Sequence, residues 1–216
     1  MVEAVSHRVV PGGHHGPVLG LTSHVRPSRT DWDPIRAYLL AMRLLHDRPG
    51  RLAHSLRAGQ QAQQVRATVP AADRDLLVSA ALLHDIGYCP ALAHSGFHPL
   101  DGANYLLLSG APERLSALVA HHSESRFLAA IGGHLADLSR FRREEGAVMD
   151  ALVHADMTAG PDGRPMTISE RLADIAARHA GEEPDRFAAR QARVPHLLAA
   201  DQRVRVRMAM RGADRP

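Results

Sequence analysis

The sequence predicts an all-α protein that folds as a single helical domain. Hydrophobic residues make up 45% of the 216 residues, so a chain of this length can bury a core without a disulfide framework. After about residue 30, apolar positions recur at helical spacing, whereas a period-two pattern occurs at one place alone. Proline and glycine stand at the ends of these stretches, where helices begin and end. These observations favour a bundle of short helices.

Capping residues and apolar faces predict the individual helices. Asp33 followed by Pro34 is an N-cap with a first-turn proline, and Thr167 with Glu170 forms a capping box. The segment LLVSAALLHD is apolar nearly all round, which predicts the central buried helix. The alternating segment RVRVRMAM (203–210) is typical of a strand, but its surroundings are helical and we assign it to a helix. The expected helices cover residues 33–46, 51–68, 71–85, 98–110, 112–122, 124–131, 146–157, 167–181 and 184–211, the last range holding one or two helices.

Composition excludes several classes of protein. Residues 1–30 carry glycines and prolines without periodicity, so we expect a flexible N-terminal arm before a helical domain spanning 31–216. The single cysteine fits a reducing compartment. No apolar run reaches the ~18 residues of a membrane span, and the N-terminus lacks a signal-peptide core. We therefore expect a cytoplasmic protein with no membrane partner. The net charge of +3 is too small to argue for nucleic acid.

Histidine and arginine are unusually abundant. The chain has 15 histidines, 26 arginines and no lysine. Part of this bias is compositional, because most of the histidines are scattered along the chain. The absence of lysine means that any bound anion must be held by arginine, by the backbone or by a metal.

Two carboxylates fall on the apolar faces of predicted helices. Asp85 and Asp156 lie there in the last helical turns, and an isolated buried carboxylate must be paired, hydrogen-bonded or bound to metal. His84 precedes Asp85, and the pair 121–122 ends another predicted helix. Helix C-termini favour cations. Each residue taken singly has an ordinary structural explanation, but arginine pairing would not explain the histidines, so the combination favours a metal site.

The segment ALLHDIGY (81–88) resembles the defining motif of the HD-domain superfamily of metal-dependent phosphohydrolases. The family pattern is a histidine, an adjacent His-Asp pair and a distal aspartate, all on helices. The resemblance covers about residues 51–175 and implies an HD-type helical bundle around a metal-site core. The corresponding residues here are His54, His84, Asp85 and Asp156.

Two further segments are similar to those that supply ligands in two-metal members of the superfamily. FHPLDGANYL offers His98, and LVAHHSES offers His121 and His122, either or both of which would serve. The resemblance implies that Asp85 bridges two ions. No GYP tripeptide follows the HH pair, which argues against the cyclic di-GMP hydrolysis of the HD-GYP phosphodiesterases. Imidazole and carboxylate ligands without thiolate favour iron or manganese, with magnesium, nickel or cobalt as alternatives.

The resemblance implies a phosphohydrolase that cleaves an ester or anhydride of a small phosphorylated substrate, with a nucleotide favoured, through a hydroxide that bridges the metals. His84 and Asp85 are the expected catalytic residues. Arg57 and Arg126 are the expected substrate-binding residues, since guanidinium groups suit phosphate, and exposed surface charge is the alternative interpretation of both. A di-iron oxygenase of the same fold and a non-catalytic nucleotide- or RNA-binding protein are the alternative functions. Nucleic acid is the less favoured partner, and a homo-oligomer is left open.

Overall fold

The computed structural model describes residues 32–213, so the expected arm over residues 1–30 lies outside the described part of the chain. Within that part the chain is helical, and its one β pairing is an isolated bridge between Ala159 and Pro165. The predicted all-α class is confirmed. The α-helices are α1 (Pro34–Leu44), α2 (Pro49–Val65), α3 (Arg74–Leu83), α4 (His98–Leu108), α5 (Glu113–His121), α6 (Arg126–Ile131), α7 (Leu135–Leu138), α8 (Ala147–Met157), α9 (Ile168–Arg178), α10 (Pro184–Ala192) and α11 (Val194–Ala213). The 3₁₀ helices are η1 (Arg66–Thr68), η2 (Ala71–Asp73), η3 (Ile86–Tyr88), η4 (Pro90–Leu92) and η5 (His122–Glu124).

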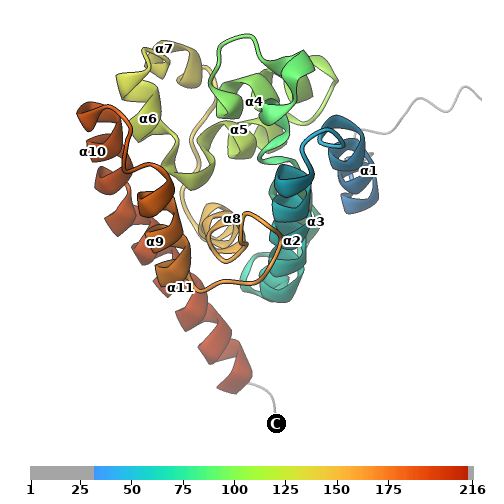
Figure 1. The fold of residues 1–216 in the computed structure, drawn as a ribbon. Helices are drawn as coiled ribbons and strands as arrows, with labels where there is room; N and C mark the ends of the chain where they lie inside the picture. The colour runs from blue at the N-terminus through green and yellow to red at the C-terminus, as the bar shows by residue number, and fades with distance from the viewer. Residues whose placement is uncertain (1–31, 214–216) are drawn as a thin grey trace, which may run out of the picture.

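Helix α8 lies at the centre of the bundle (Figure 1). It packs against α2 and α3 on one side and against α9 and α11 on the other, while α4 and α5 pack together above it. Its sequence, AVMDALVHADM, is apolar nearly all round, and nine of its eleven residues are buried. A helix with no polar face has to be surrounded by other elements, which places the polar residues of α8 inside the protein.

The predicted capping residues start their helices as expected. The Asp33 side chain accepts a hydrogen bond from the Arg36 backbone nitrogen at 2.8 Å, which satisfies one of the free N–H groups of the first turn of α1. Thr167 and Glu170 form both hydrogen bonds of a capping box at the start of α9. The direction in which each of these helices begins is therefore fixed locally, by residues next to it in sequence.

The alternating segment 203–210 is part of α11, as predicted. Arg203 and Arg207 reach back to α8 and bind the buried carboxylate of Asp150 at 2.6 and 2.8 Å, while Val204 is fully buried. The arginines of this segment therefore pair with carboxylates, two of them with Asp150 of α8 and Arg205 with Asp201 of α11 itself. At 20 residues α11 is the longest of the described helices, and no helix in the described range is long and apolar enough to cross a membrane.

A close approach of backbones positions α4. A Cβ atom on Gly87 would lie 2.0 Å from the carbonyl oxygen of His98 and 2.7 Å from the backbone nitrogen of Gly102. Glycine is the residue that permits this contact between η3 and the first turn of α4. Since η3 directly follows Asp85, the contact brings His98 next to that carboxylate.

Candidate metal centre

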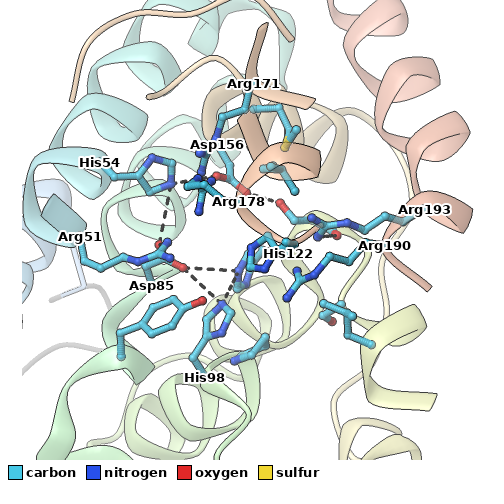
Figure 2. Close-up of a pocket in the computed structure, with 18 of the residues that line it drawn as sticks. Arg51, His54, Asp85, His98, His122, Asp156, Arg171, Arg178, Arg190 and Arg193 are labelled. Atoms are coloured by element: carbon cyan, nitrogen blue, oxygen red, sulfur yellow. Dashed lines mark hydrogen bonds and ion pairs between the residues drawn. The ribbon is translucent and has the colours of Figure 1, made fainter. Parts of the chain in front are cut away.

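Six polar side chains from distant parts of the sequence meet beside α8, and Figure 2 labels all of them except His84. They come from α2, the end of α3, the first residue of α4, the turn after α5 and the last turn of α8. Five of them are buried, and the α4 histidine is partly buried. The six residues are His54, His84, Asp85, His98, His122 and Asp156.

The first group of donor atoms gathers around one oxygen of each carboxylate. Oδ1 of Asp156 lies 2.9 Å from Nε2 of His54 and 3.6 Å from Nε2 of His84. The two imidazole nitrogens are 3.2 Å apart. Oδ2 of Asp85 lies 3.5 Å from the His84 nitrogen and 3.8 Å from the His54 nitrogen. His54, His84 and Asp85 thus bring donor atoms within 4.8 Å of one another, and Asp156 lies next to both histidines.

The second group uses the other oxygen of Asp85. Its Oδ1 atom lies 3.3 Å from Nε2 of His98 and 3.8 Å from Nε2 of His122. These two imidazole nitrogens are 3.3 Å apart. Asp85 therefore faces two sets of imidazoles with two different oxygens, which is the geometry of a carboxylate shared between two sites.

Backbone carbonyl groups fix the orientation of three of the histidines. Because a carbonyl oxygen can only accept a hydrogen bond, each Nδ1 carries the ring proton and each Nε2 presents a lone pair to the cluster. The acceptors are the carbonyls of Gly160 for His54 (3.2 Å), Ala81 for His84 (2.8 Å) and Val119 for His122 (2.6 Å).

The electrostatics of the cluster keep His98 and His122 neutral and both carboxylates ionised. Burial lowers the pKa of His122 to about 3, helped by His84 and His98 nearby. Burial also lowers the pKa of His98. For Asp85 and Asp156, burial by itself raises the pKa, but the interactions with neighbouring groups, with His84 as the largest of them, outweigh it and hold both values well below the usual range. His98, His122 and the two carboxylates are therefore in the state that binds metal.

The donor set of the cluster fits metal ions. Lone pairs and ionised carboxylates face one another at hydrogen-bond distance with no proton to share, which is unfavourable unless a cation lies between them. Imidazole nitrogen and carboxylate oxygen without thiolate suit first-row divalent metals. Histidines held at Nδ1 by the backbone are typical of metal ligands. The cluster could therefore hold metal ions, with Asp85 between two positions.

The turn after α5 has a strained backbone. Ser123 and Glu124 adopt φ values of 50° and 54°, a left-handed conformation that is uncommon outside glycine. The Ser123 hydroxyl donates a hydrogen bond to Oδ2 of Asp156, the oxygen that does not face His54. The strain thus lies where the chain turns to bring His122 and Ser123 onto the cluster, as strained residues at functional sites do.

An aromatic stack supports the second group. The ring of Tyr88 stacks on that of His98, with centroids 4.0 Å apart and an interplanar angle of 19°. The guanidinium of Arg51 lies over the same tyrosine ring at 4.1 Å and donates to Oδ2 of Asp85 at 2.9 Å. Tyr88 therefore supports His98 of the second group, and Arg51 supports Asp85, which the two groups share.

The cluster forms the floor of a cavity whose walls are rich in arginine (Figure 2). Two carboxylates line the cavity, and both belong to the cluster. The five arginines that line it are Arg51, Arg171, Arg178, Arg190 and Arg193.

The structure does not bring His121 into the cluster, although the sequence offered it as a ligand. Its Nε2 atom donates to the carbonyl of Phe141 at 2.8 Å, in the segment between α7 and α8. Neighbouring residues on a helix point about 100° apart, so His121 and His122 face different directions at the end of α5. Of the two, His122 is the one that faces Asp85.

The two arginines proposed from sequence to bind substrate do not line the cavity. Arg57 donates from Nε to the carbonyl of Gly163 at 2.6 Å, where it holds the loop after α8. Arg126 donates to Glu124 at 2.8 Å and lies over the ring of Phe127. Both side chains make local contacts, and the structure does not place either of them at the cavity.

Other residues at the site were missed from the sequence. Arg51 lies one helical turn before His54 on the same face of α2, a spacing that could have identified it. Tyr88 directly follows the HDIG segment. The arginines of α9, of α10 and of the C-cap of α10 carry no such signal, because their place over the cluster depends on how the C-terminal helices pack.

The helical bundle and its buried cluster define a class of protein, that of helical domains with a histidine–aspartate metal centre. The chain belongs to the HD domain family. The sequence pattern of the HD domain matches residues 51–182, which is more than half of the chain. The match includes all six cluster residues and ends before α10. No curated protein and no solved structure matches the chain. The family implies a metal-dependent hydrolase type of protein, in agreement with the donor set.

Proposed function

We propose that this protein is a metal-dependent phosphohydrolase that cleaves a phosphate ester or anhydride of a small molecule, with a nucleotide as the favoured substrate. The observation that carries the proposal is the position of Asp85. Its two oxygens face two groups of imidazole nitrogens at the floor of a cavity lined by arginines. Two metal ions at the floor of the cavity and arginines in its walls would suit a substrate with a phosphoryl group better than a neutral substrate.

Each group would hold one ion. His54, His84 and Asp156 would hold the first together with Oδ2 of Asp85, and His98 with His122 would hold the second together with Oδ1. When bound, two such ions activate water as a nucleophile and polarise the phosphoryl oxygens. Iron or manganese suits the nitrogen-rich donor set best, with magnesium, nickel or cobalt as alternatives.

The chain's own residues attract and orient the substrate. Five arginines against two carboxylates give the lining an excess of positive charge, which raises the local concentration of anions. One N–H group of Arg51 donates to Asp85. The other N–H groups of this guanidinium can orient a phosphoryl oxygen close to that carboxylate. His84 and Asp85 would act in catalysis as metal ligands. They would fix the position of the metal ions relative to the Arg51 guanidinium.

The first prediction concerns Asp85. We expect purified wild-type protein to contain about two metal ions per chain and to release phosphate from at least one member of a panel of nucleoside mono-, di- and triphosphates. Asp85→Asn should lose metal and reduce phosphate release by roughly 100-fold or more. Removing a hydrogen-bond partner of a metal ligand lowers metal affinity or activity by about 10–100-fold, and removing the ligand itself should have a larger effect. Metal analysis and a phosphate assay on the same samples measure both.

Asp137→Asn, on the surface helix α7, is the matched control and should behave like wild type. Undiminished phosphate release by Asp85→Asn would contradict the proposed function. Bound iron with oxygen consumption and no phosphate release would identify an oxygenase instead. Nucleotide binding that survives Asp85→Asn without bound metal or turnover would identify a binding protein.

A further inference from the structure

The C-terminal helices form one wall of the cavity, opposite Arg51 (Figure 2). Two of the four arginines on this wall have carboxylate partners of their own. Arg178 binds Asp174 with Nη2 and Nε at 2.7 and 3.0 Å, and Arg190 binds Glu182 at 2.6 and 2.8 Å. Their charges are therefore largely balanced by the protein itself.

Arg193 has no such partner. Its side chain lines the cavity, the residue is only 8% exposed, and Nη1 donates to the carbonyl oxygen of Ser123 at 3.1 Å. Among the residues that the structure describes, no carboxylate forms an ion pair with it. Burial and the neighbouring Arg190 lower the pKa of Arg193 to about 10. A buried cation without a counter-charge is costly, so an anion in the cavity would stabilise it.

Arg171 has an unused donor on the same wall. This residue is 5% exposed and lines the cavity. Its Nη1 atom donates to Asp174 at 3.1 Å, a carboxylate that also binds Arg178. Its Nε atom is buried and has no hydrogen-bond partner within residues 32–213, which is uncommon in native proteins.

We propose that Arg171 and Arg193 form a second anion subsite, so that the substrate carries two anionic groups. One group would lie at the metal centre and the other against these two guanidiniums, which bind phosphate oxygens with several donors at once. The inference deepens the proposed function and rests on it. The substrate class is then a phosphoanhydride or a bisphosphate, rather than a simple monophosphate.

The geometry keeps the two positions close together. Ser123 links them, because its carbonyl oxygen accepts from Arg193 while its hydroxyl donates to Asp156. The second anionic group is therefore expected within the same small molecule. Arg193 lies beyond the residues matched by the HD domain, whereas Arg171 lies within them, so the subsite joins the matched region to the C-terminal helices that follow it.

The test compares two ligands that the protein does not turn over. Binding of orthophosphate and of methylenediphosphonate to the Mn²⁺-loaded protein is measured by titration calorimetry. Wild-type protein should bind the diphosphonate at least about tenfold more tightly than orthophosphate, a difference of about 1.4 kcal/mol. Arg193→Gln should weaken diphosphonate binding about tenfold and leave orthophosphate binding within about twofold, and Arg171→Gln should act in the same direction. Arg186→Gln, an exposed neighbour on α10, should change neither.

Metal content and circular dichroism of each variant establish that the fold and the metal centre are intact. If Arg193→Gln fails either test, Arg193→Lys replaces it. This variant should lose part of the diphosphonate preference, because lysine keeps the positive charge but lacks the planar guanidinium group that donates two hydrogen bonds to one phosphate. An equal loss for both ligands would show that Arg193 acts through Ser123 on the metal centre and would overturn the subsite. A wild-type protein without preference for the diphosphonate would also overturn it. A preserved preference in a protein that releases no phosphate would refute the hydrolase and leave the subsite standing.

Discussion

The direction of a histidine ring is decided here by a single backbone hydrogen bond. His122 donates from Nδ1 to Val119, which aims Nε2 at Asp85, whereas His121 donates from Nε2 to Phe141 and is turned away. The two residues are adjacent in sequence and chemically identical. Their roles follow from which carbonyl oxygen lies within reach of each ring.

This difference gives a prediction at the residue scale. His122→Gln should lower the metal content from about two ions to one per chain, because the second position is then left with His98 and one oxygen of Asp85. His121→Gln should retain both ions, since an amide can replace the hydrogen bond to Phe141. Elemental analysis of the two purified variants checks this. Equal loss of metal from both would place His121 among the ligands.

Residue-scale prediction from sequence succeeded where the signal was a short pattern. HDIG at the end of an apolar helix marked His84 and Asp85, and spacing along helices marked two buried carboxylates. It could not choose between His121 and His122, because both satisfy the same pattern. It also selected Arg57, one turn after His54, when the arginine that reaches the cluster is the one a turn before it.

At the scale of elements, the packing of α4 against η3 holds the two halves of the metal centre together. Gly87 lies in the contact, and a Cβ atom there would overlap the His98 carbonyl. Gly87→Ala should therefore displace the first turn of α4 and move His98 away from Asp85. We expect loss of the second ion with retention of the first, whose ligands do not lie on α4. Metal stoichiometry measures the effect.

Gly181→Ala is the matched control, because an added Cβ there meets no atom within 4 Å and should leave both ions bound. If Gly87→Ala also retained both, α4 would have room to adjust and this contact would not set the position of His98.

Helices with strong local signals were predictable, and their arrangement was not. The caps of α1 and α9 and the apolar surface of α3 are local properties, so they could be found from the sequence. The place of α9–α11 over the cavity depends on long-range packing, in which Asp150 of α8 binds two arginines of α11. No periodicity reports such a contact, which is why the wall arginines were missed.

At the scale of the whole molecule, removal of metal should make stability depend on pH. In the metal-free protein the pKa of His122 is about 3, whereas a histidine in the unfolded chain titrates near about 6.5. Below that pH the unfolded chain binds a proton that the folded protein does not, so stability falls as the pH decreases. His122 alone accounts for about 2 kcal/mol between pH 7.5 and pH 5. His98, whose pKa is also lowered, adds to the same loss.

Urea unfolding of the metal-free protein at the two pH values measures this difference. His122→Gln should show a smaller difference than wild type, because glutamine does not titrate. A free energy of unfolding that is equal at both pH values would contradict the assignment of neutral, buried imidazoles. Restoring metal should raise stability at either pH, since the ions bind the folded state.

Helix α8 carries both Asp156, at the metal centre, and the two residues that anchor α11. Asp150 binds Arg203, and Nδ1 of His154 lies 2.6 Å from Asp201. Helix α8 thus contributes to the floor of the cavity and also anchors α11, which packs against α9 and α10, the helices of the C-terminal wall. With the proposed subsite, the separation between the two anion positions would be set by this arrangement of helices. Substrates would then be selected by the distance between their charged groups, and one-residue changes at the α8–α11 contact would alter that distance.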